Sequence, residues 1–183
     1  VYFFAAPVNA ADVFFDFGPG NHHLMAAGGA AQTEIHAHPQ HRPLPAAAGM
    51  GACMTLALAN TQVPAESVDY LCAHGPSDPV IDRVETEGIR QALGRHSYRI
   101  PVSSIKGVTG NPLAAAGPME LIACALAMRH GRIPPTANYT TPDPACDLDY
   151  VPEARRARPA HALVNVHGMG GGNTTLVIRE PPS

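Results

Sequence analysis

The fold of this chain is decided by one stretch, Arg99-Ile-Pro-Val-Ser-Ser-Ile-Lys106-Gly-Val-Thr-Gly-Asn111-Pro-Leu-Ala-Ala-Ala-Gly117. A short apolar run is followed by glycines and then by an alanine-rich segment that continues to about Arg129. This order predicts a strand, a tight turn and a helix, with Pro112 tolerated in the first helical turn. Lys106 is the only lysine beside eleven arginines. Lysine is a compact cation that can be tuned in a confined site, so the pattern fits either a functional group or a surface lysine on a turn.

Outward from this stretch, strand-like and helix-like segments alternate along the chain. The expected helices cover residues 46–60, Pro79–Leu93 (capped by Ser77 or Asp78) and the segment after Lys106. The expected strands are Val1–Phe4, Val13–Phe17, Val68–Ala73, 99–103, Ala162–His167 and Thr174–Arg179, whereas 21–45 and 131–160 are expected to be loops. This alternation predicts an α/β layered fold, in which functional sites gather where strands end.

Bulk properties narrow the class of protein. The 183 residues correspond to about one domain, and a hydrophobic fraction of 45% supplies a core. A net charge of −3 and a pI near 6.4 indicate neither a nucleic-acid partner nor an anionic membrane surface. No apolar run approaches the roughly 18 residues of a membrane span. The four cysteines form no CxxC pair and are expected to be buried thiols in a cytoplasmic protein. Because the chain begins at Val1 without a signal-peptide pattern, we expect it to start inside a larger protein.

Three turns could converge on one site: His74-Gly75, Lys106 to Asn111, and Gly168 to Asn173. A histidine, a lysine and a primary amide together would polarise a carbonyl and move a proton. The glycine run after Gly168 leads into no helix and lacks the P-loop lysine, which disfavours a phosphate cradle. A rival zinc site at His36, His38 and His41 has no clear fourth ligand, and a solvated loop is the favoured interpretation.

Six motifs then follow one another in an order that resembles a known family. They are 68–75 (VDYLCAHG), 101–110 (PVSSIKGVTG), 114–120 (AAAGPME), 133–136 (IPPT), 143–152 (DPACDLDYVP) and 168–173 (GMGGGN). The chain resembles the C-terminal half of a β-ketoacyl-acyl-carrier-protein synthase of the thiolase-like condensing enzymes. The resemblance implies a thiolase-like layered fold with a mixed sheet flanked by helices. It spans 1–183 as one C-terminal ketoacyl-synthase domain, with 1–13 a poorly aligned lead-in and the N-terminal half missing.

The resemblance also implies a reaction and a set of residues. Such enzymes carry an acyl chain on a cysteine of the N-terminal half and condense it with a decarboxylating malonyl unit. His74 would stabilise the enolate oxygen and Lys106 would order the charge network. The remaining implied residues are Glu85, Glu120 and Asn173 in the supporting network and Met169, Gly170 and Gly171 in the gating loop.

The sequence departs from the family pattern at three positions. Asn111 stands where this branch has its second histidine, and an amide donates a hydrogen bond but cannot become a cation. The resemblance therefore implies a Cys-His-Asn set. Pro76 and Asp78 replace two threonines that touch the phosphopantetheine arm, so pantetheine binding is expected to be altered. None of the four cysteines lies in a nucleophile-like elbow, which places the reacting sulfur outside this chain.

Two functions remain open on these grounds. The first is a ketosynthase that is active once joined to its N-terminal half; the second is a non-catalytic partner resembling a chain-length factor. In either case the resemblance implies acyl carrier protein as a partner, a homo- or heterodimer, no metal, and no cofactor beyond the phosphopantetheine arm that delivers acyl chains.

Overall fold

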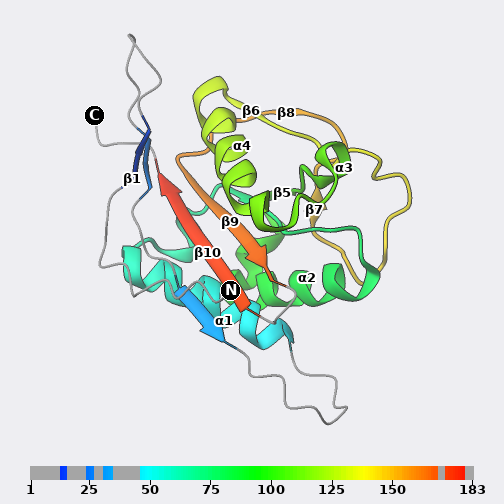
Figure 1. Cartoon of the computed structure of the whole chain (residues 1–183), viewed down its shortest axis with the longest axis horizontal. Coiled ribbons are helices and arrows are strands. Elements are labelled where there is room, and N and C mark those ends of the chain that lie inside the picture. The colour runs from blue at the N-terminus through cyan, green and yellow to red at the C-terminus, as the bar shows by residue number, and fades with distance from the viewer. Residues whose placement is uncertain (1–12, 16–23, 27–30, 35–45, 169–171, 180–183) are drawn as a thin grey trace.

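The computed structural model describes residues 13–15, 24–26, 31–34, 46–168 and 172–179. Its centre is one mixed sheet with strand order β1-β2-β10-β9-β4-β5-β7, and β3 also pairs with β10 (Figure 1). Strands β9, β4, β5 and β7 are mutually parallel, whereas β10 runs antiparallel to β9. The strands of this sheet are β1 Val13–Phe15, β2 Leu24–Ala26, β3 Ala31–Glu34, β4 Tyr70–Cys72, β5 Pro101–Ser103, β7 Asp149–Tyr150, β9 His161–His167 and β10 Gly172–Arg179.

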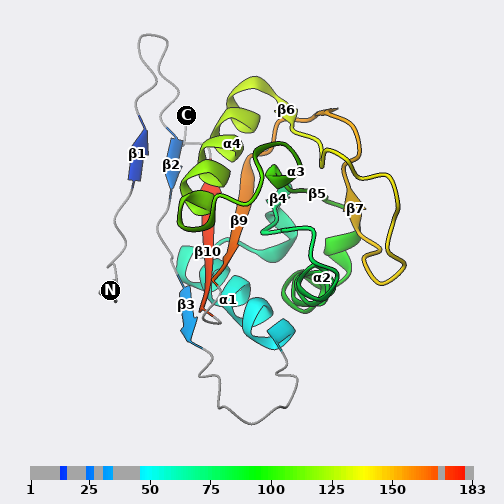
Figure 2. The ribbon, with the colours of Figure 1, turned by 45° about the vertical axis from the view of Figure 1, so that its right-hand side comes forward.

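Helices cover both faces of the sheet (Figure 2). They are α1 Ala46–Thr61, α2 Pro79–Leu93, α3 Lys106–Thr109 and α4 Ala116–His130, and a two-stranded ribbon joins β6 Arg132–Ile133 to β8 Arg155–Arg156. Three 3₁₀ turns, Ala65–Ser67, Gly94–Tyr98 and Leu113–Ala115, connect them. The mixed sheet flanked by helices confirms the predicted fold class.

The alternation of side chains along β4 creates two cores. Leu71 packs with α1, α2 and the facing residues of β5 and β9, while Tyr70 and Cys72 pack with α4 on the other side. Successive side chains of a strand point to opposite faces, so a strand that is apolar at every position must be covered on both sides. The uninterrupted apolar run around β4 therefore dictates a layered architecture.

Two glycines explain how α1 and α2 pack. A Cβ at Gly88 would lie 2.9 Å from Cβ of Met50 and 3.1 Å from the backbone nitrogen of Gly51. The helices therefore approach backbone to backbone at this crossing. Glycine costs helix stability in isolation, but here it permits a contact that a larger residue would block.

The N-terminal cap of α2 matches the sequence prediction. Asp78 Oδ1 accepts hydrogen bonds from the backbone N–H groups of Val80 and Ile81 at 2.9 and 3.0 Å. Pro79 occupies the first helical position, where its missing N–H has no cost. Of the two candidates, Asp78 and not Ser77 is the cap.

Three sequence expectations need correction. The segment 21–45 is not only loop, because β2 and β3 lie within it and pair with β10. Residues 131–160 likewise contribute the short strands β6, β7 and β8. The helix after Lys106 is divided, since the one-turn α3 ends before Gly110 and α4 begins only at Ala116. These short strands are defined by pairing and not by local periodicity: β2 and β3 pair with β10, β7 pairs with β5, and β6 pairs with β8. The expected strand Val1–Phe4 and the histidines 36, 38 and 41 lie outside the described residues.

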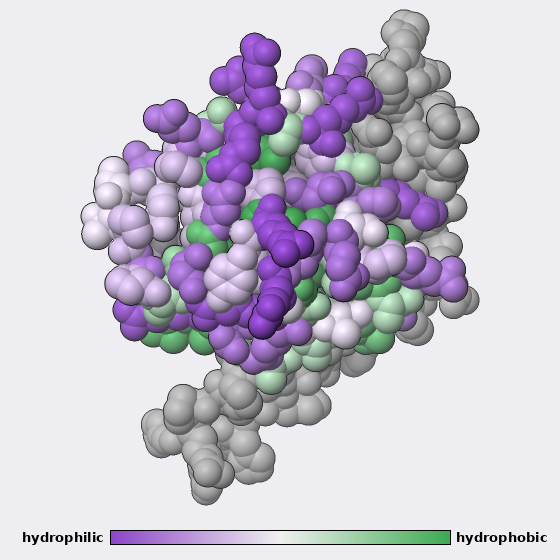
Figure 3. Space-filling model, turned by 180° about the vertical axis from the view of Figure 1, so that it is seen from behind, coloured by the Kyte–Doolittle hydropathy of each residue, from purple (hydrophilic) through white to green (hydrophobic). Residues whose placement is uncertain are grey.

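Helix length and exposed apolar surface bear on whether the described part of the chain could enter a membrane. No helix there is long and apolar enough to cross a bilayer. On the side opposite to the view of Figure 1, hydrophilic residues dominate and apolar residues show only in narrow strips between them (Figure 3). Exposed apolar side chains do occur on the segment from α3 to α4, namely Val108, Leu113, Ile122 and Leu126.

Candidate active site

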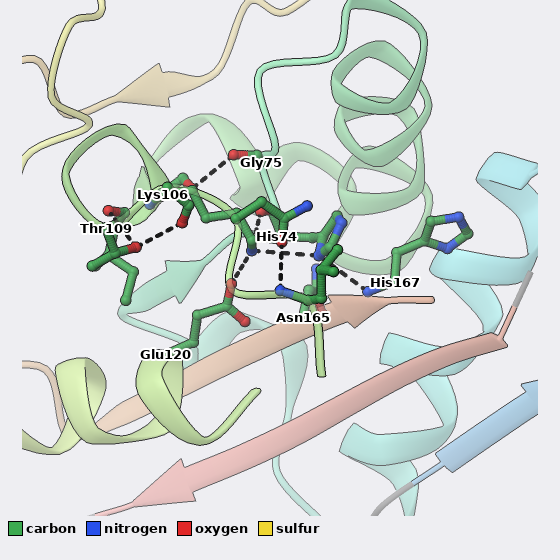
Figure 4. Close-up of polar contacts among 12 residues, drawn as sticks. His74, Gly75, Lys106, Thr109, Glu120, Asn165 and His167 are labelled. Carbon is green, nitrogen blue, oxygen red and sulfur yellow. Dashed lines mark hydrogen bonds and ion pairs between the residues drawn. The ribbon is translucent and has the colours of Figure 1, made fainter. Parts of the chain in front are cut away.

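The site forms where the adjacent parallel strands β4 and β5 end. Cys72 is paired with Ser103, so the chain that leaves each strand emerges beside the other. Ser104 Oγ donates to the carbonyl oxygen of Gly75 at 2.8 Å, which joins the two turns. His74 from the first turn and Lys106 from the second therefore meet, as the sequence predicted (Figure 4).

Lys106 is buried and all of its donor capacity is used. Its side chain is 3% exposed and forms an ion pair with Glu120 of α4, whose side chain is 1% exposed. The ammonium group also donates to the carbonyl oxygen of His74 and lies 3.4 Å from the Nδ1 atom of that residue. A lysine ammonium has three N–H donors, and these three partners account for them. The surface-turn interpretation of Lys106 is therefore wrong.

Gly107, the residue after Lys106, lies very close to a neighbouring loop. A Cβ at position 107 would lie 2.3 Å from the carbonyl oxygen of Ala137. The side chain of Asn138 also donates to the carbonyl oxygen of Gly107 at 3.0 Å. The loop at 137–138 thus packs directly against the lysine turn, which explains the glycine beside the only lysine.

Glu85 of α2 fixes the histidine turn from the other side. Its two carboxylate oxygens accept the backbone N–H groups of His74 and Gly75, each at 2.9 Å. The amide nitrogen of Asn165 donates to the same carboxylate at 3.3 Å. Burial raises the pKa of Glu85, and these hydrogen bonds act in the opposite direction. Glu120 behaves similarly, because burial raises its pKa to about 7 despite its contact with Lys106.

The protonation state of His74 follows from its surroundings. Burial, Lys106 and His167 together lower its pKa to about 4, so the ring is neutral at neutral pH. Its Nδ1 atom faces two donors, the ammonium of Lys106 at 3.4 Å and the backbone N–H of His167 at 3.3 Å. Nδ1 is therefore the acceptor nitrogen, and the ring proton lies on Nε2. His74 is a neutral donor that its neighbours hold in one tautomer.

Asn173 is connected to this group through His167, a residue that the sequence motifs did not single out. Its Oδ1 atom lies 2.8 Å from Nδ1 of His167, directly across the β9–β10 pair. Two residues further along the same pair of strands, the hydroxyl group of Thr175 donates to the side-chain oxygen of Asn165 at 3.0 Å. The sequence pattern could have indicated His167, because Asn165 and His167 alternate with apolar residues at the end of the apolar run that starts at Ala162.

Asn111 does not join His74, contrary to the convergence expected from the sequence. Gly110 has a φ of +69° and turns the chain outward, and Asn111 Oδ1 accepts the backbone N–H of Leu113 at 3.2 Å. The side chain is exposed and lines a cavity of about 600 Å³ together with Lys106 and Pro76. His74 lines a different, smaller cavity with His167 and Asn173.

The remaining predicted residues have mixed outcomes. Pro76 lines the larger cavity, whereas Asp78 uses its carboxylate to cap α2 and does not line that cavity. Met169, Gly170 and Gly171 lie outside the described residues. Within the described segments, no group of three or more histidine, cysteine or acidic side chains could hold a metal ion.

The cysteines provide no evident nucleophile. All four are buried, and only Cys146 lines the larger cavity. Burial raises the pKa of its thiol, and the carboxylates of Asp143 and Asp82 raise it further. A reactive cysteine requires a thiolate stabilised by positive charge, which is the opposite environment.

Comparisons with known proteins show the family of this chain. Residues 22–140 match the family model described as "Beta-ketoacyl synthase, C-terminal domain". A 3-oxoacyl-[acyl-carrier-protein] synthase 2 from Coxiella burnetii is 44% identical over 138 residues, which cover 75% of this chain and 33% of that protein. The chain thus spans about a third of the length of this relative.

Solved structures show the same likeness. A chain of the AntDE:AntF complex, a type II PKS acyl-carrier protein with its ketosynthase bound to the hexaketide, superposes with a TM-score of 0.82. It is 34% identical, and the match covers 89% of this chain and 40% of that one. The ishigamide ketosynthase/chain length factor gives a TM-score of 0.76 at 30% identity, covering 84% and 37%. The chain belongs to the family of β-ketoacyl synthase C-terminal domains.

Proposed function

We propose that this chain supplies the C-terminal half of the condensing site of a β-ketoacyl-acyl-carrier-protein synthase. The complete protein would carry out a decarboxylative Claisen condensation in cytoplasmic fatty acid or polyketide synthesis. One observation carries the proposal: His74 is a neutral imidazole with its proton on Nε2, held by Lys106 and by the backbone of His167. A neutral donor of fixed orientation suits an oxygen on which negative charge develops.

The proposed chemistry uses this donor at the thioester oxygen of a malonyl unit. The bond between the malonyl carbon and its carboxylate breaks, carbon dioxide leaves, and the electron pair moves into an enolate. His74 donates from Nε2 to the enolate oxygen. The enolate carbon then attacks the acyl thioester of the enzyme, and the enzyme sulfur leaves as a thiolate. Because the pKa of His74 is about 4, the ring keeps one proton and remains neutral throughout the neutral pH range.

Lys106 and the two glutamates would act by holding His74. The N–H groups of the ammonium are already directed to Glu120 and His74, so Lys106 is not a donor to substrate in this arrangement. Glu85 holds the backbone of the histidine turn. These residues preorganise the donor, so that little reorganisation is needed when charge develops.

The larger cavity suits the arm that delivers the acyl chains. It lies beside the lysine turn and is bordered by Pro76 and Asn111. We propose that it receives the phosphopantetheine arm of an acyl carrier protein and that no metal takes part. Asn111 would contact the arm at this rim and would not assist His74.

The missing partner is the N-terminal half of a ketosynthase, which would provide the cysteine nucleophile. Four exposed apolar side chains on α3, on α4 and on the turn that joins them would be covered by this other part of the protein; they are Val108, Leu113, Ile122 and Leu126. The complete protein would then function as a homo- or heterodimer.

A second candidate is a non-catalytic partner that resembles a chain-length factor. Two observations favour it: position 111, where the family resemblance implies a histidine, is an asparagine, and all four cysteines are buried, with the pKa of the Cys146 thiol raised by burial. In that case the contacts around His74 would stabilise the fold, and His74 would have no part in condensation.

The test uses the complete protein, including the residues upstream of Val1. His74→Ala should lower formation of condensed product from acyl- and malonyl-carrier protein by about 100-fold or more, since one oxyanion donor is lost. His130→Ala, at the exposed end of α4, is the matched control and should retain wild-type activity. Normal turnover by His74→Ala would contradict the proposed role. A complete protein that yields no product alone, but stimulates a separate ketosynthase, would support the chain-length-factor alternative.

A further inference from the structure

A second imidazole lies beside His74 in the same small cavity. His167 is the last residue of β9, and β9 runs parallel to β4, so its end reaches the same edge of the sheet as His74. The two ring centroids are 5.9 Å apart, with the ring planes at 74°. His74, His167 and Asn173 line one cavity. Figure 4 shows the backbone nitrogen of His167 directed at His74, with its ring on the side away from Lys106.

Asn173 determines which nitrogen of His167 carries a proton. The amide oxygen of Asn173 lies 2.8 Å from Nδ1 of His167. Since a carbonyl oxygen only accepts hydrogen bonds, Nδ1 must be the protonated nitrogen. In the neutral ring, Nε2 therefore has an open lone pair, and none of the described residues forms a hydrogen bond with it. Asn173 is itself 3% exposed and lies opposite His167 in the strand register, which fixes this contact.

The two histidines consequently have opposite tautomers. His74 accepts at Nδ1 and presents an N–H at Nε2, whereas His167 donates from Nδ1 and presents a lone pair at Nε2. Lys106 lies beside His74 and opposes protonation of that ring, while the oxygen of Asn173 holds the ring N–H of His167 on Nδ1. One ring is suited to donate to an oxygen, and the other is suited to accept a proton.

We propose that His167 is the proton-accepting imidazole of this site and performs the step for which Asn111 has no basic group. The inference rests on the proposed function. When the acyl chain is loaded, Nε2 of His167 takes the proton of the cysteine thiol supplied by the N-terminal half. The sulfur attacks the carbonyl carbon of the acyl-carrier thioester, and the carbon–sulfur bond to the pantetheine arm breaks. The departing thiolate then takes the proton from Nε2, so that one thiol and one thioester are exchanged for another thiol and thioester.

A purely structural role for His167 makes a different prediction. In that case the histidine would only tether Asn173, and any side chain that kept this hydrogen bond would preserve activity. His167→Asn separates the two roles, because the amide nitrogen of asparagine matches the position of Nδ1 but nothing replaces Nε2. His161→Asn, at the other end of β9 and outside both cavities, is the matched control.

The experiment measures acyl loading in the complete protein. An acyl-carrier protein with a radiolabelled acyl group is mixed with enzyme, without malonyl substrate, and transfer of label to the enzyme is followed in a single turnover between pH 6 and 9. We expect His167→Asn to slow loading about 100-fold at neutral pH, as loss of a general base does. The rate should recover as the pH rises and the thiolate forms unaided. His161→Asn should load at the wild-type rate.

His167→Gln provides a second variant in case His167→Asn folds poorly, as judged by circular dichroism. It also lacks a basic nitrogen, so the same loss is expected. Loading at the wild-type rate by either folded variant, with an unchanged pH profile, would overturn the inference.

Failure of this inference can be distinguished from failure of the proposed function. If His74→Ala abolishes condensation while His167→Asn loads normally, only the role of His167 is wrong. If the wild-type protein is never acylated, or if His74→Ala condenses normally, the proposed function itself is wrong and the inference falls with it.

Discussion

Residues 104–107 and 108–115 are neighbours in the chain but differ in how deeply their side chains are buried and in the contacts that they make. In the first segment, 104–107, Lys106 is almost fully buried and contacts Glu120 and His74. In the second segment, 108–115, Val108 is 74% exposed and Leu113 is 63% exposed. Asn111 is exposed too, and its side-chain oxygen accepts a hydrogen bond from the backbone N–H of Leu113 in its own turn.

The difference shows that a continuous motif need not form one continuous site. A buried charge must have partners, so Lys106 is fixed from several elements at once. An exposed amide has no such requirement, because water satisfies it. Four substitutions test this contrast, and they are given in order of decreasing effect.

Lys106→Met should have the largest effect, since it leaves Glu120 buried without its partner. Breaking a buried ion pair from one side costs about 3–5 kcal/mol. We expect a loss of that size in the unfolding free energy of the complete protein, measured by urea denaturation, together with loss of condensing activity. The double variant Lys106→Met/Glu120→Leu should regain most of the stability but none of the activity. If the single and double variants were equally unstable, the ion pair would not be the cause.

The second prediction concerns pH and His74. The pKa of His74 in the folded protein is about 4, below the ordinary histidine value of 6.5, so between these values the unfolded chain binds more protons and acid favours unfolding. His74 therefore adds stability as the pH rises from about 4 to 6.5, by up to about 3 kcal/mol. Glu120 opposes this trend, because its raised pKa makes stability fall as the pH rises from 4.5 to about 7.

The measurement is the difference in unfolding free energy between the wild-type protein and His74→Gln at several pH values. This difference should grow as the pH rises through that window, since only the wild type has the histidine. A difference that is constant with pH would mean that His74 is not shifted in the folded state.

Gly107→Ala should have the third-largest effect, because its Cβ would lie 2.3 Å from the carbonyl oxygen of Ala137. Forced overpacking of this kind costs about 1–3 kcal/mol, and the displacement should also disturb Lys106. Gly117→Ala is the matched control in α4, where the new Cβ would meet only Val166 at 3.3 Å. Its melting temperature should stay close to that of the wild type. Equal melting temperatures for the two variants would show that the loop at 137 moves aside at little cost in stability.

Asn111→Ala should change stability least, by no more than about 0.5 kcal/mol, as expected for an exposed position. If Asn111 contacts the pantetheine arm, KM for the carrier-bound substrate should rise while kcat changes little. A large fall in kcat with unchanged KM would instead place this amide beside His74 during the reaction. That result would restore the convergence that the motif suggested.

Most of the layered fold could be predicted because its elements have strong local signals. The apolar runs at β4, β9 and β10 and the Asp78 cap of α2 appear directly in the sequence, and the structure agrees with them. The short strands β2 and β3 could not be predicted in this way, since they are defined by pairing with β10. The division between α3 and α4 also depends on packing, as Leu113 has a φ of +53° that no sequence rule anticipates.

From the sequence it follows that His74 and Lys106 each lie in a turn after a strand, and the ordered motifs indicate the family that the chain resembles. Tertiary contacts alone show that Asn111 bonds to its own exposed turn and that His167, held by Asn173, lies beside His74. The reason is physical: residue order fixes which turns follow which strands, but the direction of each side chain depends on the buried partners that must satisfy it. Lys106 and His74 have such partners, whereas Asn111 is satisfied by its own turn and by solvent.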